Sequence, residues 1–402
     1  MSIDYKKICV VTLHQSEAYG GGAEHQIDYL IDHLMPLDRY DVYYLARNTD
    51  PSAPSTGYEI VPIGHKNGTL KFGYSIDAVS LYRALLTIRP NVIYQRVACA
   101  YTGVCAFYAR RHGARFVWHV AHDSDVDGSR SLFGTNPLAR SLEALAVGYA
   151  IERADAIVVQ THQQAQLLHG NYGREADAVI SNFHPKPAET VDKSGAATVL
   201  WIANLKRWKQ PEVFVRIAAA LQHLRGVRFV MVGAPATASR DRGWNAGLMH
   251  AIAATPNLEY LGPRTHDQVN ELLARSHVLV NTSNQEGFPN TFIQAWMREV
   301  PVVSFVNPDG VLSRENVGIH ARTEEGLVDG VRLLVTDPRK RLEYAQRAHV
   351  YAIARHSLRN AELLERLLDK QPADGGADAD EPVTKTSNTV PRFVDQDDWS
   401  TR

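Results

Sequence analysis

Short apolar runs alternate with amphipathic helical patterns along most of the chain. Residues 8–13, 116–121 and 198–203 are examples of the apolar runs, and their length and composition are typical of buried strands. Apolar residues spaced three and four apart follow several of these runs, as expected for helices. Strands that alternate with helices favour parallel sheets that are covered on both faces. The sequence therefore predicts an α/β protein with doubly wound sheets.

The length of 402 residues accommodates two domains of about 150 to 200 residues each. The strand–helix pattern stops near residue 185 and restarts at residue 198. Residues 186–197 contain two prolines, serine, glycine and charged residues without periodicity, which indicates a linker. Residues 371–402 also lack apolar periodicity, and we interpret them as a disordered acidic tail.

Residues 278–305 follow the order strand, loop, helix, strand. An apolar run at residues 278–280 leads into a polar loop with Gly287 and Pro289, and a helical pattern comes next. The start of that helix faces the carboxyl end of a parallel sheet, where free N–H groups favour an anion such as phosphate. Glu286 stands beside this place and Gln294 follows eight residues later, so both are candidates to line one crevice.

A glycine run, Gly20-Gly21-Gly22, separates the first predicted strand from a helical pattern at residues 27–34. Glycines at such a turn let the backbone approach a ligand closely. The run is equally compatible with an ordinary flexible turn. It is not a complete dinucleotide-binding fingerprint, which argues against a nicotinamide oxidoreductase.

The run Glu286-Gly287-Phe288-Pro289, with Gln294 after it, resembles the donor-binding signature of the family 4 retaining glycosyltransferases of the GT-B fold. That family usually has a second acid where this chain has Gln294, but glutamine can still hydrogen-bond a ribose hydroxyl. The resemblance implies that Glu286 contacts the donor sugar as a catalytic residue and that Gln294 holds the nucleotide ribose. The alternative interpretation is an ordinary turn and helix cap in an α/β protein.

The same resemblance implies a donor site assembled from several loops. Lys209 matches a family lysine that grips the diphosphate, whereas Asn204 replaces the family arginine, so that Lys206 or Arg207 would supply the second charge. A solvated basic turn is the alternative. The donor-binding residues that we predict are Gly21, Gly22, Lys206, Lys209, Arg264, Phe288, Pro289, Asn290, Thr291 and Gln294.

The loop after the strand at residues 116–121 has three interpretations. The spacing of Asp123, Asp125 and Asp127 imitates the start of a calcium loop, but position twelve is Gly134 instead of glutamate. Asp123-Ser124-Asp125 also fits the Asp-x-Asp metal motif of the other main glycosyltransferase fold, which has a single nucleotide-binding domain. We favour the third, in which His122 resembles the active-site histidine of family 4 enzymes. His119 is the rival candidate.

Composition excludes some functions and compartments. There are 43 lysines and arginines against 44 aspartates and glutamates, so the basic surplus of a nucleic-acid-binding protein is missing. Cys9, Cys99 and Cys105 form neither a disulfide framework nor a zinc pattern, which suits a reducing cytosol. No signal peptide opens the chain and no apolar run reaches about 18 residues. We expect a cytoplasmic protein, with peripheral contact to the inner membrane surface left open.

The sequence thus predicts two Rossmann-like domains that face each other across a cleft, as in GT-B. Residues 1–185 would bind a glycan or lipid-linked acceptor, residues 198–354 the nucleotide sugar, and residues 355–370 would return to the first domain as a helix. The expected activity is transfer of a hexose from a UDP- or GDP-type sugar with retention of configuration, in cell-surface or extracellular polysaccharide synthesis, without a metal or other cofactor. A nucleotide-sugar epimerase and a non-catalytic nucleotide- or sugar-binding protein are the alternatives.

Overall fold

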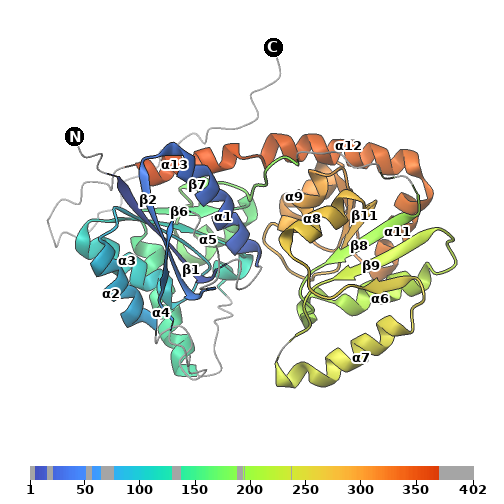
Figure 1. The fold of residues 1–402 in the computed structure, drawn as a ribbon, viewed down its shortest axis with the longest axis horizontal. Helices are drawn as coiled ribbons and strands as arrows, with labels where there is room; N and C mark the ends of the chain where they lie inside the picture. Colours follow the sequence, from blue (N-terminus) through green and yellow to red (C-terminus); the bar gives the residue numbers. More distant parts are fainter. Residues whose placement is uncertain are drawn as a thin grey trace, which may run out of the picture.

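The computed structural model describes residues 5–15, 21–50, 57–64, 77–128, 137–187, 193, 195–236 and 238–370. They form two α/β domains that lie side by side, the first in blue to green and the second in yellow to orange (Figure 1). Each domain has one parallel sheet with helices on both faces. The prediction of two doubly wound domains is confirmed.

The first sheet has the strand order β3-β2-β1-β4-β5-β6-β7. Its strands are β1 (Lys6–His14), β2 (Tyr40–Asn48), β3 (Glu59–Pro62), β4 (Val92–Arg96), β5 (Arg115–His119), β6 (Ala156–Val159) and β7 (Ala178–Val179). The long helices of this domain are α1 (Gly22–Leu34), α2 (Ala78–Ile88), α3 (Ala100–His112), α4 (Pro137–Arg153) and α5 (His162–Tyr172). Because β1 is flanked by β2 and β4, the chain direction across the sheet reverses there, which opens a crevice at the carboxyl ends of the strands.

The second sheet has the order β10-β9-β8-β11-β12-β13. Its strands are β8 (Ala197–Ile202), β9 (Val227–Val232), β10 (Leu258–Tyr260), β11 (Val278–Asn281), β12 (Val302–Ser304) and β13 (Gly318–His320). The helices are α6 (Pro211–Ala220), α7 (Arg242–Ala253), α8 (His266–Ala274), α9 (Asn290–Trp296), α10 (Val311–Arg314), α11 (Glu324–Thr336) and α12 (Pro338–Arg355). The reversal occurs at β8, between β9 and β11, so the second crevice faces the first.

The last described helix, α13 (Arg359–Asp369), belongs to the first domain in space (Figure 1). Leu364 and Leu368 are fully buried in the same core as Ile8 of β1 and Ile27 of α1. Helix α12 carries the chain across from the second domain along one side of both. The chain therefore passes between the two domains twice, once before β8 and once after α12.

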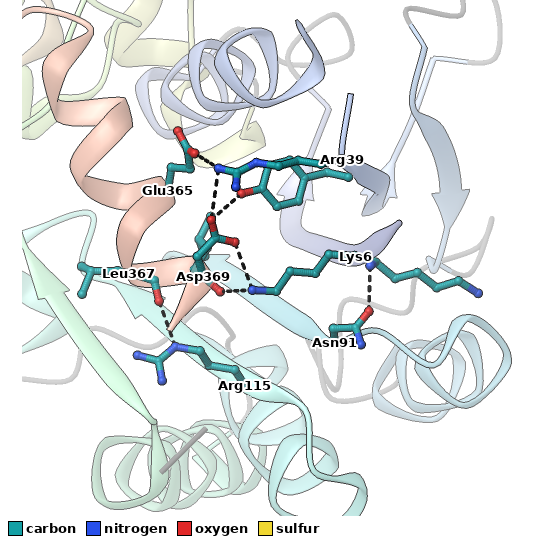
Figure 2. A network of polar contacts seen from close by, with 10 residues as sticks. Lys6, Arg39, Asn91, Arg115, Glu365, Leu367 and Asp369 are labelled. Carbon is teal, nitrogen blue, oxygen red and sulfur yellow. Dashed lines mark hydrogen bonds and ion pairs between the residues drawn. The ribbon is translucent and has the colours of Figure 1, made fainter. Parts of the chain in front are cut away.

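Polar contacts fasten the end of α13 to the first domain (Figure 2). Lys6 Nζ forms an ion pair with Asp369 at 3.1 Å, and Arg115 Nε donates to the Leu367 carbonyl at 2.9 Å. Arg39 pairs with Glu365 in the same network. These bonds satisfy carbonyl and carboxylate groups at the carboxyl end of a helix, where cations are favourable.

Four elements have no counterpart among the sequence predictions: β3, β13, α7 and the four-residue helix α10. Strand β3 ends in a proline at the edge of its sheet, β13 has three residues, and α7 contains Gly243 and Gly247, which lower helix propensity. Strand β8 begins at Ala197, which we had placed in the linker. The predicted acidic tail at residues 371–402 lies outside the described residues. Among the described helices, none combines the length and apolarity that crossing a bilayer requires.

Candidate functional site

A cleft of about 1040 Å³ lies between the two domains. It is bounded by the loops that leave the carboxyl ends of strands in both sheets, which is where open α/β sheets bind ligands. Every residue that the sequence assigned to the site lines this cleft: Gly21, Gly22, His122, Lys206, Lys209, Arg264, Glu286, Phe288, Pro289, Asn290, Thr291 and Gln294. The roles of these residues stay predictions, but the tertiary structure brings all of them together.

Lys209 and Glu286 form an ion pair on the second-domain wall of the cleft. Lys209 Nζ contacts Glu286 Oε1, and the two side chains are 17% and 9% exposed. The carboxylate also accepts a hydrogen bond from the Ser283 hydroxyl at 2.6 Å, while the Trp208 ring lies 4.0 Å from Lys209 Nζ. Burial lowers the pKa of Lys209, and Glu286 opposes this effect. Lys209 lines the cleft, so its ammonium group is within reach of an anion bound there.

The neighbouring cations have different surroundings. Lys206 lines the cleft, whereas Arg207 donates from Nε to Asp241 at 3.1 Å and stacks over the Trp244 ring at 5.1 Å. Asn204, which stands in place of the family arginine, accepts a hydrogen bond from a backbone N–H on the next loop. Of the two residues considered as substitutes for that arginine, Lys206 is the one at the cleft.

His122 and His119 have contrasting environments. His122 lines the cleft, its Nδ1 lies 2.8 Å from the Ser124 hydroxyl, and its ring packs edge-on against Trp208 of the other domain at 6.0 Å. His119 is fully buried in β5, and its Nδ1 lies 2.8 Å from the Tyr94 hydroxyl. Only His122 of this pair lies at the cleft, so the geometry favours it over His119 as the active-site candidate.

The two aspartates after His122 are engaged by the protein itself. Asp125 Oδ2 accepts the backbone N–H groups of Ala121 and His122 at 2.9 and 3.0 Å. Asp123 Oδ1 accepts the Gln164 side-chain N–H at 3.0 Å. These bonds hold the loop in shape. Across the described ranges, no group of three or more His, Cys, Asp or Glu side chains is arranged to hold a metal ion.

The start of α1 meets the start of α9 across the cleft. Asn290 Nδ2 donates to the Gly22 carbonyl at 2.6 Å, and a Cβ at Gly22 would lie 2.7 Å from the same nitrogen. A larger residue would displace the Asn290 amide and cost its hydrogen bond to the Gly22 carbonyl. Gly287 is similarly crowded, since a Cβ there would lie 3.2 Å from the Ala121 carbonyl oxygen of the first domain.

Several cleft residues carried no recognisable signal in the sequence. Arg96, at the end of β4, donates from Nη2 to Asn182 Oδ1 at 2.9 Å, and Asn182 Nδ2 donates to the Phe288 carbonyl at 3.1 Å. Tyr29 and His266 meet from opposite domains. A polar residue at the end of a buried strand, such as Arg96, is the one clue that could have pointed to the pair of Arg96 and Asn182. The contact between Tyr29 and His266 joins residues 237 positions apart, so no local sequence pattern points to it.

Comparison with known families gives two adjacent matches. Residues 21–182 match the family described as Glycosyl transferase 4-like domain, and residues 196–337 match Glycosyl transferases group 1. The first range lies in the first domain and the second range lies in the second domain, and the cleft lies between these two domains. No curated protein matches the chain.

Solved structures share the fold at low sequence identity. HepE from Anabaena, in complex with UDP and glucose, has a TM-score of 0.71 at 17% identity, covering 90% of this chain and 99% of its own. Sucrose-phosphate synthase from Thermosynechococcus elongatus has a TM-score of 0.70 at 14% identity, covering 90% of this chain and 98% of its own. WaaG, a glycosyltransferase involved in lipopolysaccharide biosynthesis, has a TM-score of 0.68 at 16% identity, covering 90% of this chain and 99% of its own.

The two family matches lie on the two domains that form the cleft, and the arrangement of those domains is that of the solved structures above. The chain belongs to the GT-B glycosyltransferases of the group 1, family 4-like type.

Proposed function

We propose that this glycosyltransferase moves a hexose from a nucleotide diphosphate sugar to a glycan or lipid-linked acceptor and retains the anomeric configuration. The observation that carries the proposal is the ion pair between Lys209 and Glu286 in the cleft between the domains. A cation for the leaving diphosphate and a carboxylate for the sugar hydroxyls then lie side by side.

The second domain would bind the donor. Lys206 and Lys209 line the cleft and would stabilise the negative charge that develops on the leaving diphosphate. Ser283 donates a hydrogen bond to Glu286 and so holds its carboxylate in place. A carboxylate held in place would orient the sugar hydroxyls and favour the reactive conformation of the donor. The Gln294 side-chain oxygen would accept a hydrogen bond from a ribose hydroxyl. HepE, whose structure contains UDP and glucose, makes a UDP-sugar the first donor to test.

The first domain would bind the acceptor beside Gly21, Gly22 and His122. In the step that we propose, the bond from the anomeric carbon to the phosphate oxygen breaks as the acceptor oxygen bonds to the same face of that carbon. The acceptor proton passes to the departing phosphate. Closure of the domains would exclude water, which otherwise hydrolyses the donor. We propose that the reaction needs no metal, because lysines supply the positive charge.

The biological setting belongs to the same proposal. WaaG acts in lipopolysaccharide biosynthesis, which supports a role in cell-surface or extracellular polysaccharide assembly on the cytoplasmic side of the membrane. Peripheral contact with the inner membrane surface would bring a lipid-linked acceptor to the cleft. Flotation with anionic vesicles tests that contact.

The donor is tested by calorimetry of the full chain with UDP, GDP and their glucose conjugates. We expect one nucleotide family to bind and Lys209→Ala to lose most of that affinity. Lys340→Ala is the matched control, because Lys340 pairs with Glu343 on the exposed face of α12. Absence of binding to all four compounds would contradict the proposal.

The reaction is tested by proton NMR of donor and acceptor mixtures. A product with the donor's anomeric configuration supports retention, and unchanged rates in EDTA support a metal-free step. Interconversion of the donor sugar without an acceptor would indicate the epimerase instead. Binding without any turnover would indicate a non-catalytic protein.

A further inference from the structure

His266, the first residue of α8, lies between one side chain of each domain. Its Nε2 is 3.0 Å from the hydroxyl of Tyr29 on α1 and 3.0 Å from the side-chain nitrogen of Gln294 on α9. Both distances are in the ordinary hydrogen-bond range. One ring atom thus connects the opposite walls of the cleft.

The amide of Gln294 is held at its nitrogen. Besides His266, Nε2 contacts Asn270 Oδ1 at 3.3 Å. Gln294 is 6% exposed and lines the cleft, and among the described residues its Oε1 makes no hydrogen bond. An amide oxygen without a protein partner is an acceptor for a ligand hydroxyl. The orientation of the amide therefore decides whether that oxygen is offered to the ligand.

His266 is fixed from several directions. Its ring packs against His25 of α1 at 4.4 Å between centroids and against His184 at 5.9 Å. Burial, reinforced by the nearby His25, lowers the pKa of His266 to about 4, so the ring is neutral near pH 7. A neutral imidazole accepts a hydrogen bond at only one nitrogen. The Gln294 amide requires that nitrogen to be Nε2, so the proton is on Nδ1, and the 3.2 Å contact between Nδ1 and Asn270 Nδ2 is not a second accepted hydrogen bond.

We propose that His266 is a positioning residue of the donor site. It orients the Gln294 amide so that Oε1 faces a donor hydroxyl, and its bond to Tyr29 makes this orientation depend on closure of the two domains. The inference rests on the proposed function, since the hydroxyl is that of the nucleotide ribose. If His266 only packed the domain boundary, its loss would lower stability and leave ribose recognition unchanged.

The test compares the affinity for UDP with that for 2′,3′-dideoxy-UDP by calorimetry. We expect the wild-type protein to prefer UDP by about tenfold or more, because the dideoxy nucleotide would cover Gln294 Oε1 without offering it a hydrogen-bond donor. The ratio of the affinity for UDP to that for 2′,3′-dideoxy-UDP should fall close to one in Gln294→Ala and in His266→Phe. It should fall about threefold in Tyr29→Phe, which removes a single hydroxyl and leaves the ring in place.

Tyr82→Phe is the matched control, since Tyr82 makes the same kind of contact with His112, at 3.1 Å, away from the cleft. A folded His266→Phe protein that keeps the full preference for UDP would overturn the inference and leave the proposed function intact. If His266→Phe does not fold, an unchanged preference in Tyr29→Phe would overturn it. A wild-type protein that binds neither UDP nor GDP would contradict the proposed function and the inference together.

Discussion

The carboxylate of Asp309 in the second domain accepts the backbone N–H of His162 in the first domain at 2.9 Å, and the next N–H, of Gln163, at 3.0 Å. Asp309 thereby caps helix α5 from across the domain boundary. Capping by a carboxylate satisfies orphan donors and complements the helix dipole. Because the two partners belong to different domains, these bonds depend on the arrangement of the domains in this structure.

Asp309→Asn should favour the open arrangement. Asparagine tolerates the left-handed backbone at this position, where φ is +47°, but it retains one acceptor oxygen and no charge. We expect a larger radius of gyration in small-angle X-ray scattering. In Asp337→Ala, the control, a cap of α12 within one domain is lost, and the dimensions should not change. Identical scattering of Asp309→Asn and wild type would contradict a role in closure.

Glu286→Gln should separate binding from turnover. The amide keeps the shape of the side chain but cannot form the ion pair with Lys209. We expect the affinity for the nucleoside diphosphate to stay within about threefold, since Lys209, the residue that we propose for the phosphates, is unchanged. Turnover should fall about 100-fold because the sugar loses its fixed orientation. Steady-state kinetics beside calorimetry check this, and unchanged turnover would exclude Glu286 from catalysis.

Acid should destabilise the protein partly through His356. Burial lowers the pKa of His356 to about 4, against roughly 6.5 in an unfolded chain. Between these values the unfolded state binds more protons, so stability is full above about pH 6.5 and is lost as the pH falls toward 4. The effect is about 2 kcal/mol at pH 5.

The measurement is urea unfolding at pH 7.5 and pH 5. His356→Gln keeps a donor for the Asn182 carbonyl, which His356 Nδ1 contacts at 2.7 Å, and should lose less stability on acidification than wild type. His250→Gln, at an exposed position on α7, is the control. Glu24, whose pKa is raised to about 7 mainly by burial, acts in the opposite direction, so the difference between variants is the informative quantity.

Leu364→Ala should destabilise the first domain although Leu364 lies near the end of the described chain. The side chain is fully buried against β1 and α1. Leucine-to-alanine changes at such sites cost about 3 kcal/mol. Leu333→Ala, at a position on α11 that is 40% exposed, should cost much less. Equal urea midpoints for the two variants would contradict the docking of α13 as a part of the first-domain core.

Most of the fold could be predicted because its signals are local. Buried strands such as β1 and β8 read as continuous apolar runs, and helices such as α11 show a clear apolar face. The short edge strands β3 and β13 have no such signal, since little of their surface is buried in a repeating pattern. Two glycines in α7 similarly weaken its helical pattern.

The candidate site was partly predictable for a related reason. Glu286, Phe288 and Gln294 lie close together in the sequence, and the strand and helix on either side of them place them at one end of the sheet. The choice between His122 and His119, and between Lys206 and Arg207, was open until the neighbours of each side chain were known. The spacing of residues along one strand or loop does not show which of their side chains faces the other domain.

The sequence by itself determined most of the strand and helix order, the two-domain arrangement and the loops that line the cleft, because hydrophobic periodicity and turn residues act over a few positions. Only the tertiary structure decided that Tyr29 meets His266 and that Asp309 caps α5. These contacts join residues more than a hundred positions apart. They depend on how two folded surfaces dock, which no local pattern records.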